Sequence, residues 1–241
     1  MNATETVNKT FSTNGRDRVN RLVQLLTKFL SLEESIGFSK ESREKLLNLS
    51  NNIGQARKLM RIGRQVEFIV GARKASNIKD DFIRATTVGK NLSLAIWLAF
   101  DSISWFQSIG LITSTKEQKK SVVDRGNKFW LFGLFLSILC NLYKYSIAER
   151  KLVLENKHLR QITSKKMEAD PETKNRLVTY IKNLKEESKA SLLLMVHDIF
   201  DAICFPALGL ELTPSFFTPK MAFGLGTITT ATGSLPMLAA L

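Results

Sequence analysis

The division between apolar and basic positions is sharpest in residues 53–74, IGQARKLMRIGRQVEFIVGARK. At about 100° per residue, the α-helical period, the large apolar side chains fall on one side and the basic side chains on the other. The apolar positions are Leu59, Ile62, Val66, Ile69 and Val70, and the basic positions are Arg57, Lys58, Arg61 and Arg64. Such a helix suits an anionic membrane surface, which it binds through the basic face and enters through the apolar face. The alternative is a helix of a globular domain whose cationic face is solvated.

Two amphipathic helices are predicted in the first part of the chain. Residues 14–32 carry apolar side chains at helical spacing, and Asp17 lies near their start, where a negative charge suits the helix dipole. Ser39 can cap a second helix, predicted from about 40 to 75, with Gly54 as the candidate point of interruption. No run of residues alternates like a β-strand between hairpin turns. The predicted fold class is therefore all-α: amphipathic helices and a membrane-embedded helical bundle with a C-terminal apolar helix.

Four stretches in the rest of the chain are apolar and poor in charge, as membrane segments are. They cover residues 91–112, 129–143, 190–210 and 221–241. The first holds one charge, Asp101, whose carboxylate costs about 2.5–3.5 kcal/mol at a bilayer centre unless it faces protein or water. The second is short enough to be a marginal span. The last holds no charge and is long enough to cross a bilayer.

The C-terminal stretch also carries small residues on one face. Gly224, Gly226 and Gly233 allow helices to approach closely within a membrane, which makes them candidates for helix packing and self-association. From these patterns we expect two regions: a basic amphipathic-helix region over residues 1–90, and a membrane-associated helical region over residues 91–241.

The net charge narrows the class of partner. The chain has a formal charge of +13 and a pI of about 9.8. A basic excess of this size points either to nucleic acid or to phospholipid. No recognised nucleic-acid-binding motif accompanies the basic positions, and a charge-free C-terminal segment does not suit a soluble regulator. We therefore expect an anionic phospholipid membrane as partner, and no nucleic acid.

Catalytic chemistry is not expected from this sequence. It contains no phosphate-binding loop, dinucleotide fingerprint, nucleophile elbow or zinc-protease motif. The nearest approach to a constellation is His197, Asp198 and Asp201, on consecutive turns of one predicted helix. These groups can bind a cation or relay protons, or they can form a polar stripe that packs against the basic helices. We expect no enzyme activity, no cofactor and no metal.

Short motifs follow one another in a recognisable order along the chain. The first is Thr13–Val19 (TNGRDRV), and the second is Arg57–Gly63 (RKLMRIG). The later motifs are Phe100-Asp101, Trp105, Gly110-Leu111, Lys128-Phe129-Trp130, Asp198, Asp201, Pro206 and the glycine-rich Gly224–Gly233. From residue 13 to near the C-terminus this set resembles the peroxisomal biogenesis factor 11 family, with Thr229-Thr230 standing where the family pattern has two serines.

The resemblance implies a peroxisomal membrane protein that elongates the organelle membrane before fission, with its N-terminal region facing the cytosol. It implies that the helix at 57–74 inserts into the outer leaflet and bends it, and that copies of the chain self-associate. It also implies a partner in the fission machinery, including a dynamin-related GTPase. A pore for small metabolites is the alternative, and it needs Asp101, Asp198 and Asp201 to face a water-filled lumen. A soluble helical scaffold is a third possibility.

Overall fold

The computed structural model describes residues 13–164 and 171–204, with six further positions (221, 223, 224, 226, 227 and 230), and its regular secondary structure is entirely helical. The helices are α2 (Thr13–Leu32), α3 (Lys40–Met60), α4 (Gln65–Ala75), α5 (Asp81–Ser108), α6 (Lys116–Ser164) and α7 (Pro171–Cys204). The prediction of an all-α fold is confirmed.

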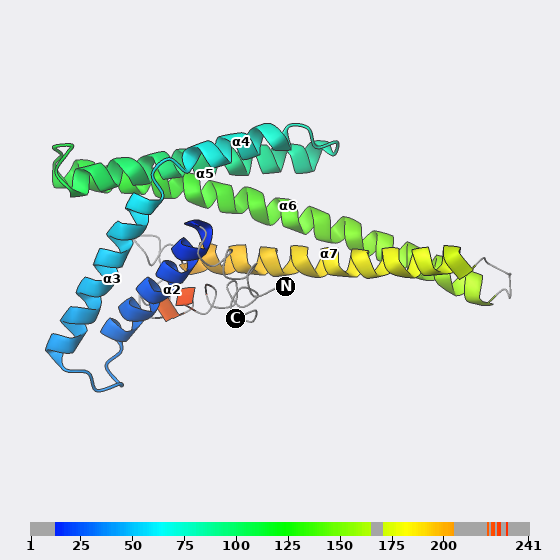
Figure 1. Cartoon of the computed structure of the whole chain (residues 1–241), viewed down its shortest axis with the longest axis horizontal. Helices are drawn as coiled ribbons and strands as arrows, with labels where there is room; N and C mark the ends of the chain where they lie inside the picture. The colour runs from blue at the N-terminus through cyan, green and yellow to red at the C-terminus, as the bar shows by residue number, and fades with distance from the viewer. Residues whose placement is uncertain are drawn as a thin grey trace.

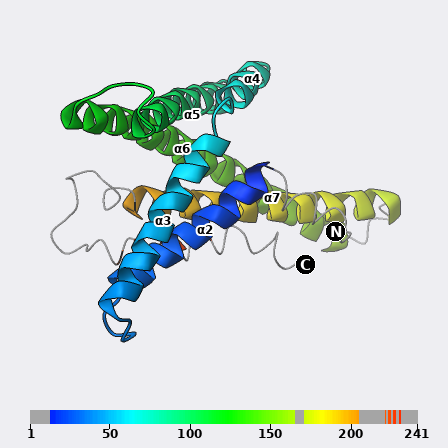
Figure 2. The ribbon, with the colours of Figure 1, turned by 60° about the vertical axis from the view of Figure 1, so that its left-hand side comes forward.

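Neighbouring helices in the chain fold back on one another as pairs. Contacts join α2 to α3, α4 to α5, α5 to α6, and α6 to α7. Figure 1 shows α4 and α5 lying along the first part of α6, while α7 returns along α6 from its far end. The α2–α3 pair projects from this layer at a steep angle, and it does so in both views (Figures 1 and 2).

Short polar side chains cap the N-termini of α3 and α5, and a proline begins α7. The Ser39 hydroxyl accepts a hydrogen bond from the N–H of Ser42 at 3.2 Å, which confirms the predicted cap of α3. Asp80 caps α5 in the same way, with its Oδ1 accepting from the N–H of Ile83 at 2.9 Å. α7 begins at Pro171, a residue suited to the first turn of a helix because that turn has no partner for its N–H.

The helix predicted from about 40 to 75 is interrupted, but not at Gly54. Gly54 lies inside α3, which ends at Met60, and α4 begins at Gln65. Between them Gly63 adopts a positive φ of 85°, a left-handed conformation that ends helices and that glycine adopts without strain. The expectation of one continuous helix over residues 53–74 was therefore wrong, and its two halves can point in different directions.

The paired helices α6 and α7 change character along their length. At the far end Leu152, Ile181 and Leu184 are buried between them, and the charged side chains point outward, as in a water-soluble helix pair. Toward the other end the pattern reverses. There the polar side chains of Ser137, Asn141 and Asp198 are buried. The large apolar side chains that point outward at this end include Phe132, Phe135, Leu193 and Leu194.

An apolar outside around a polar inside is the arrangement expected of helices within lipid, where apolar side chains need no burial and polar ones need partners. Among the described helices, one, α6, is long and apolar enough to cross a membrane. At about 1.5 Å per residue its 49 residues extend roughly 73 Å, more than twice a hydrocarbon core. The predicted short segment 129–143 is the apolar part of this longer helix.

Small residues bring α5 and α6 together. A Cβ atom added at Gly126 would lie 2.9 Å from the Cβ of Phe100, the root of a side chain that cannot swing away. A Cβ atom at Gly133 would meet Ser93 at 3.4 Å, an ordinary van der Waals distance. Both glycines are on α6 and face α5, so they differ mainly in the space available.

We therefore expect Gly126→Ala and Gly133→Ala to differ in their effect on stability. Gly126→Ala overpacks the contact and should destabilise the protein by about 1–3 kcal/mol. Gly133→Ala should be neutral or stabilise it by up to about 1 kcal/mol, since alanine favours a helix over glycine. Thermal unfolding in detergent micelles measures both changes. Equal midpoints for the two variants would contradict the close contact at Gly126.

Candidate functional site: an inward-facing basic cluster beside an exposed apolar arc

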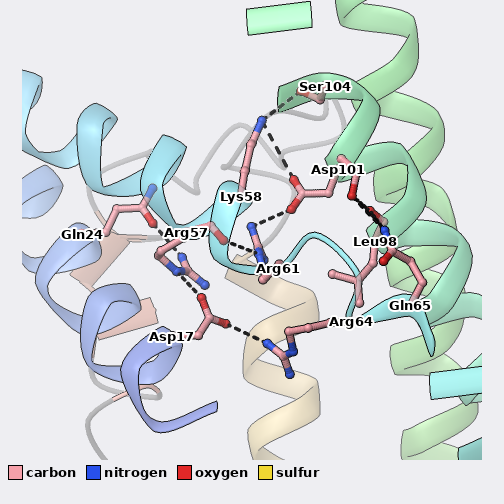
Figure 3. Close-up of polar contacts among 11 residues, drawn as sticks. Asp17, Gln24, Arg57, Lys58, Arg61, Arg64, Gln65, Leu98, Asp101 and Ser104 are labelled. Carbon is pink, nitrogen blue, oxygen red and sulfur yellow. Dashed lines mark hydrogen bonds and ion pairs between the residues drawn. The ribbon is translucent and has the colours of Figure 1, made fainter. Parts of the chain in front are cut away.

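The basic cluster (Arg57, Lys58, Arg61 and Arg64) lies at the end of α3 and in the turn to α4. Its side chains are only 11–24% exposed, because they point toward α2 and α5 (Figure 3). The sequence predicted that these residues share a face, and the structure brings them together. The face is turned into the molecule, so in this structure it forms neither the solvated cationic surface of a globular helix nor the outward basic face that was expected to bind a membrane surface.

Asp17 on α2 forms ion pairs with two members of the basic cluster, Arg57 and Arg64. The Nε of Arg57 donates a hydrogen bond to Asp17 Oδ1 at 2.8 Å, and Arg64 Nη1 lies 3.8 Å from Oδ2. The Nη1 of Arg57 also donates to Gln24 Oε1 at 2.7 Å, about two turns further along α2 than Asp17. Burial alone raises the pKa of the Asp17 carboxyl, but the hydrogen bond from Arg57 and the charges of the nearby arginines outweigh it, so the pKa lies below its usual value.

Asp101 on α5 forms ion pairs with the other two members, Arg61 and Lys58. Arg61 Nη2 lies 2.8 Å from Asp101 Oδ2, and the guanidinium lies over the Trp97 ring at 5.1 Å. Lys58 Nζ is 4.0 Å from Asp101 Oδ1 and donates a hydrogen bond to Ser104 at 2.9 Å. Asp101 thus faces protein, one of the two environments in which its charge was expected to be tolerated.

One polar side chain fixes the start of α4 against α5. Gln65 Nε2 donates to the carbonyl of Leu98 at 3.1 Å and to the hydroxyl of Ser102 at 2.8 Å. The short turn between α3 and α4 is therefore tied to α2 through Asp17 and to α5 through Asp101 and Gln65 (Figure 3). If Asp17 or Asp101 is replaced by a neutral residue, its arginine stays buried without a counter-charge, which is strongly destabilising.

The apolar arc (Leu59, Ile62, Val66, Ile69 and Val70) lies outside. Its side chains are 37–62% exposed, and Val66 is the most exposed. The opposite face of α4 is built from small residues, with Ala72 and Ala75 buried against α5. The predicted segregation of the two faces is present across both helices, with the basic face inside and the apolar face outside.

A second polar cluster joins α5, α6 and α7. Ser137 donates a hydrogen bond to Asp198 Oδ2 at 2.5 Å and accepts one from Lys90 Nζ at 2.7 Å, while Asn141 lies 3.4 Å from the same carboxylate oxygen. Asp198 is therefore buried among partners, and His197 Nδ1 lies 3.7 Å from its other oxygen.

Asp201 pairs with α2. Its Oδ1 accepts from Arg21 Nη2 at 2.8 Å, and its side chain is buried. This agrees with the hypothesis of a polar stripe packing against the basic helices. Among the residues that the structure describes, no group of three or more His, Cys, Asp or Glu side chains is placed to hold a metal ion.

Two of the three predicted small-residue positions lie against α2 of the same chain. A Cβ added at Gly224 would lie 3.3 Å from the Phe29 ring, and one at Gly226 would lie 3.4 Å from Leu25. Gly233 is outside the described residues. Helix packing at Gly224 and Gly226 is thus seen within one chain, and their part in self-association stays a prediction.

Several residues of the site carry little signal in the sequence. Asp17 stands out only by its place near a helix start, and its partner Arg57 lies 40 residues away. Trp97, Ser137 and Lys90 carried no pattern that singled them out. The one hint in the sequence is that Asp17 is an acid flanked by two bases, Arg16 and Arg18.

Comparison with known proteins gives one family and several distant relatives. The family described as Peroxisomal biogenesis factor 11 (PEX11) matches residues 3–238. Peroxisomal membrane protein PMP30B of Candida boidinii is 26% identical over 142 residues, which are 57% of this chain and 56% of that protein. Peroxisomal membrane protein PMP27 of Saccharomyces cerevisiae is 26% identical over 141 residues, 57% of each.

A human relative shows the same extent of similarity. Peroxisomal membrane protein 11B of Homo sapiens is 24% identical over 130 residues, 54% of this chain and 49% of that protein. The chain thus matches about half the length of these curated relatives. No solved structure is significantly similar to it.

The Asp17 pairs should stabilise the protein in a pH-dependent way. Asp17→Asn leaves Arg57 buried without its anion, and we expect a loss of about 1–3 kcal/mol at pH 7, less than for a fully buried pair. The lowered pKa means that this stabilisation is complete above about pH 4 and is lost as the pH falls through the pKa of the folded protein. The difference in thermal midpoint between wild type and variant should therefore shrink on acidification.

The matched control is Glu34→Gln. Glu34 pairs with Arg43 at 3.2 Å but is 82% exposed, so its loss should change stability by no more than about 0.5 kcal/mol. Equal effects of Asp17→Asn and Glu34→Gln, or a midpoint difference that does not change with pH, would contradict the assigned role of Asp17.

Proposed function

This chain belongs to the peroxisomal biogenesis factor 11 (PEX11) family of peroxisomal membrane proteins, and we propose that it remodels the peroxisomal membrane, elongating it ahead of fission. The apolar arc would enter the outer leaflet as a wedge. The observation that carries this proposal is the arc itself: five large apolar side chains, exposed on neighbouring helices, on a turn that buried ion pairs hold to the rest of the molecule. Exposed apolar surface of this kind favours a lipid or protein contact.

The physical basis of the wedge is the burial of apolar side chains in one leaflet. A valine, leucine or isoleucine side chain that becomes fully buried contributes about 1.5–3 kcal/mol. An amphipathic helix enters about 5–10 Å into the headgroup boundary, which expands that leaflet relative to the other. Many copies side by side would turn this area difference into curvature.

The wedge is effective because α4, which carries most of the apolar arc, is fixed to α5 and through it to α6. α4 packs on α5, and α5 packs on α6, the candidate membrane-spanning helix. The insertion depth of the arc would then be set by the position of α6 in the bilayer. A free amphipathic helix can slide or tilt away from the strain it causes, whereas a helix fixed by Asp17 and Asp101 cannot.

The wedge also requires a defined orientation of the chain in the membrane and contacts with partners. A wedge in the outer leaflet requires the N-terminal region to face the cytosol. Curvature over a tubule requires many copies, so self-association belongs to the proposal, with Gly224 and Gly226 among its candidate contacts. The fission machinery, including a dynamin-related GTPase, is the proposed partner at the end of elongation.

The alternative of a metabolite pore has less in its favour. A pore needs acidic side chains along a water-filled lumen, and Asp198 and Asp201 are instead buried against Ser137 and Arg21. Asp101, the third acid that the pore would need, pairs with Arg61.

The apolar arc gives the direct test. Val66→Ser together with Ile69→Ser removes apolar surface that is already exposed, so the fold should be retained while insertion is weakened. We expect the full-length protein, reconstituted in anionic liposomes, to lose most of its tubulating activity in electron micrographs. Each exposed side chain contributes up to about 1.5–3 kcal/mol of insertion free energy, enough for a tenfold or larger effect.

The control pair is Val153→Ser with Leu154→Ser. These side chains are 68% and 65% exposed, at least as much as Val66 and Ile69, but they lie on the far end of α6, where the charged side chains point outward. They should leave tubulation unchanged. Wild-type tubulation by the Val66/Ile69 variant would refute the wedge, and equal loss in both pairs would show that exposed apolar surface acts without regard to place.

A further inference from the structure

A cleft of about 230 Å³ opens beside the basic cluster, between the α3–α4 turn and the α5–α6 pair. One wall is basic and consists of Arg21, Arg57, Lys58 and Arg61. The other is aromatic and consists of Trp97, Phe100 and Trp130. Val122 and Val123 extend the apolar side. The cleft therefore has one cationic side and one apolar side.

The acids around the cleft do not balance its bases. Asp101 is the one acid among the lining residues, against four cations. Asp17 and Asp201 are not among the lining residues, but they pair with Arg57 and Arg21. Even with these two included, three carboxylates stand against the four cations of the basic wall, which leaves one positive charge in excess.

Lys58 is the least well compensated of these cations. Its ammonium is 4.0 Å from the nearest Asp101 oxygen, whereas Arg21, Arg57 and Arg61 each lie 2.8 Å from a carboxylate. Its closest partner is the neutral hydroxyl of Ser104. Burial lowers the pKa of Lys58 although the charge of Asp101 raises it, as expected for an ammonium that lacks a full counter-charge.

The arginines of the basic wall can also accept an anion without leaving their partners. Among the hydrogen bonds of the described residues, Arg57 uses its Nε and Nη1, and Arg21 uses one Nη2 contact. A guanidinium has five N–H donors, so donors remain on both. Phosphate oxygens are the acceptors that such donors and a lysine ammonium bind best.

We propose that this cleft binds the phosphate group of an anionic amphiphile, with Lys58 as the central cation and the aromatic wall against the adjoining apolar part. The volume is below that of a site for a drug-sized molecule, so the phosphate enters and the rest of the amphiphile extends outside. A membrane phospholipid with a phosphate monoester has this chemistry. The inference rests on the proposed function only in taking this anion from the membrane.

The experiment uses the full-length protein in neutral detergent micelles, titrated with short-chain phosphatidic acid. Trp97 and Trp130 line the cleft, so their fluorescence reports occupancy, and native mass spectrometry gives the number of lipids bound. We expect saturable binding of one phosphatidic acid per chain. Lys58→Gln, which keeps a hydrogen-bonding group beside Ser104, should weaken binding at least about tenfold, the loss of one charge-assisted hydrogen bond.

Two variants control for charge and for folding. Lys45→Gln removes the same charge from the same helix at a side chain that is 75% exposed, and it should change affinity by less than about twofold. Lys58→Arg keeps the charge and should retain binding. Unchanged binding by Lys58→Gln would overturn the proposal, and so would equal binding of short-chain phosphatidylcholine.

Competition identifies the source of the phosphate. Glycerol 3-phosphate should compete weakly, because it lacks the apolar part that meets the aromatic wall. Competition as strong as that of the lipid would overturn the role assigned to that wall and leave a site for soluble phosphate. Micelles contain no bilayer to bend, so this experiment measures lipid binding and not tubulation. The Val66/Ile69 variant should bind phosphatidic acid normally. The proposed binding site and the proposed membrane wedge can therefore be refuted independently of each other.

Discussion

Buried positive charge at the α3–α4 turn is the constraint on which the rest of this structure depends. Four basic side chains in the space of eight residues are largely removed from water, and each is stable there only beside an acid or a strong acceptor. Asp17 supplies one counter-charge from α2, and Asp101 supplies another from α5. These two carboxylates fix where α2 and α5 must lie relative to the turn.

The same constraint decides which surface is left outside. Since the basic side of the segregated helix is used for internal pairs, its apolar side faces outward. In a water-soluble domain this arrangement would be unfavourable, because it exposes large apolar side chains. It becomes reasonable if the surroundings are lipid. The change along α6 and α7 from buried apolar to buried polar side chains also favours lipid surroundings. Ser137, Asn141 and Asp198 lie inside, and Phe132 and Phe135 lie outside.

Local features of the fold could be predicted from the sequence, and long-range pairing could not. The helical class, the cap at Ser39 and the segregation of the two faces all depend on residues within a few turns of one another. The break at Gly63 was missed in favour of Gly54, because a glycine ends a helix only where the surroundings favour its left-handed conformation. Which face would be buried depended on Asp17 and Asp101, each about 40 residues from its arginine. Periodicity carries no information at that separation.

The central claim is that the apolar arc enters the hydrocarbon region of the bilayer. Spin labels placed singly along residues 61–74 of the full-length protein in anionic liposomes measure this directly, through collisions with oxygen in the lipid and with a nickel chelate in water. We expect high oxygen contact at Val66, Ile69 and Val70, and low contact with both reagents at Ala72, which packs on α5. Strong contact of the nickel chelate with labels at Val66 and Ile69 would contradict it, because the arc would then lie in water.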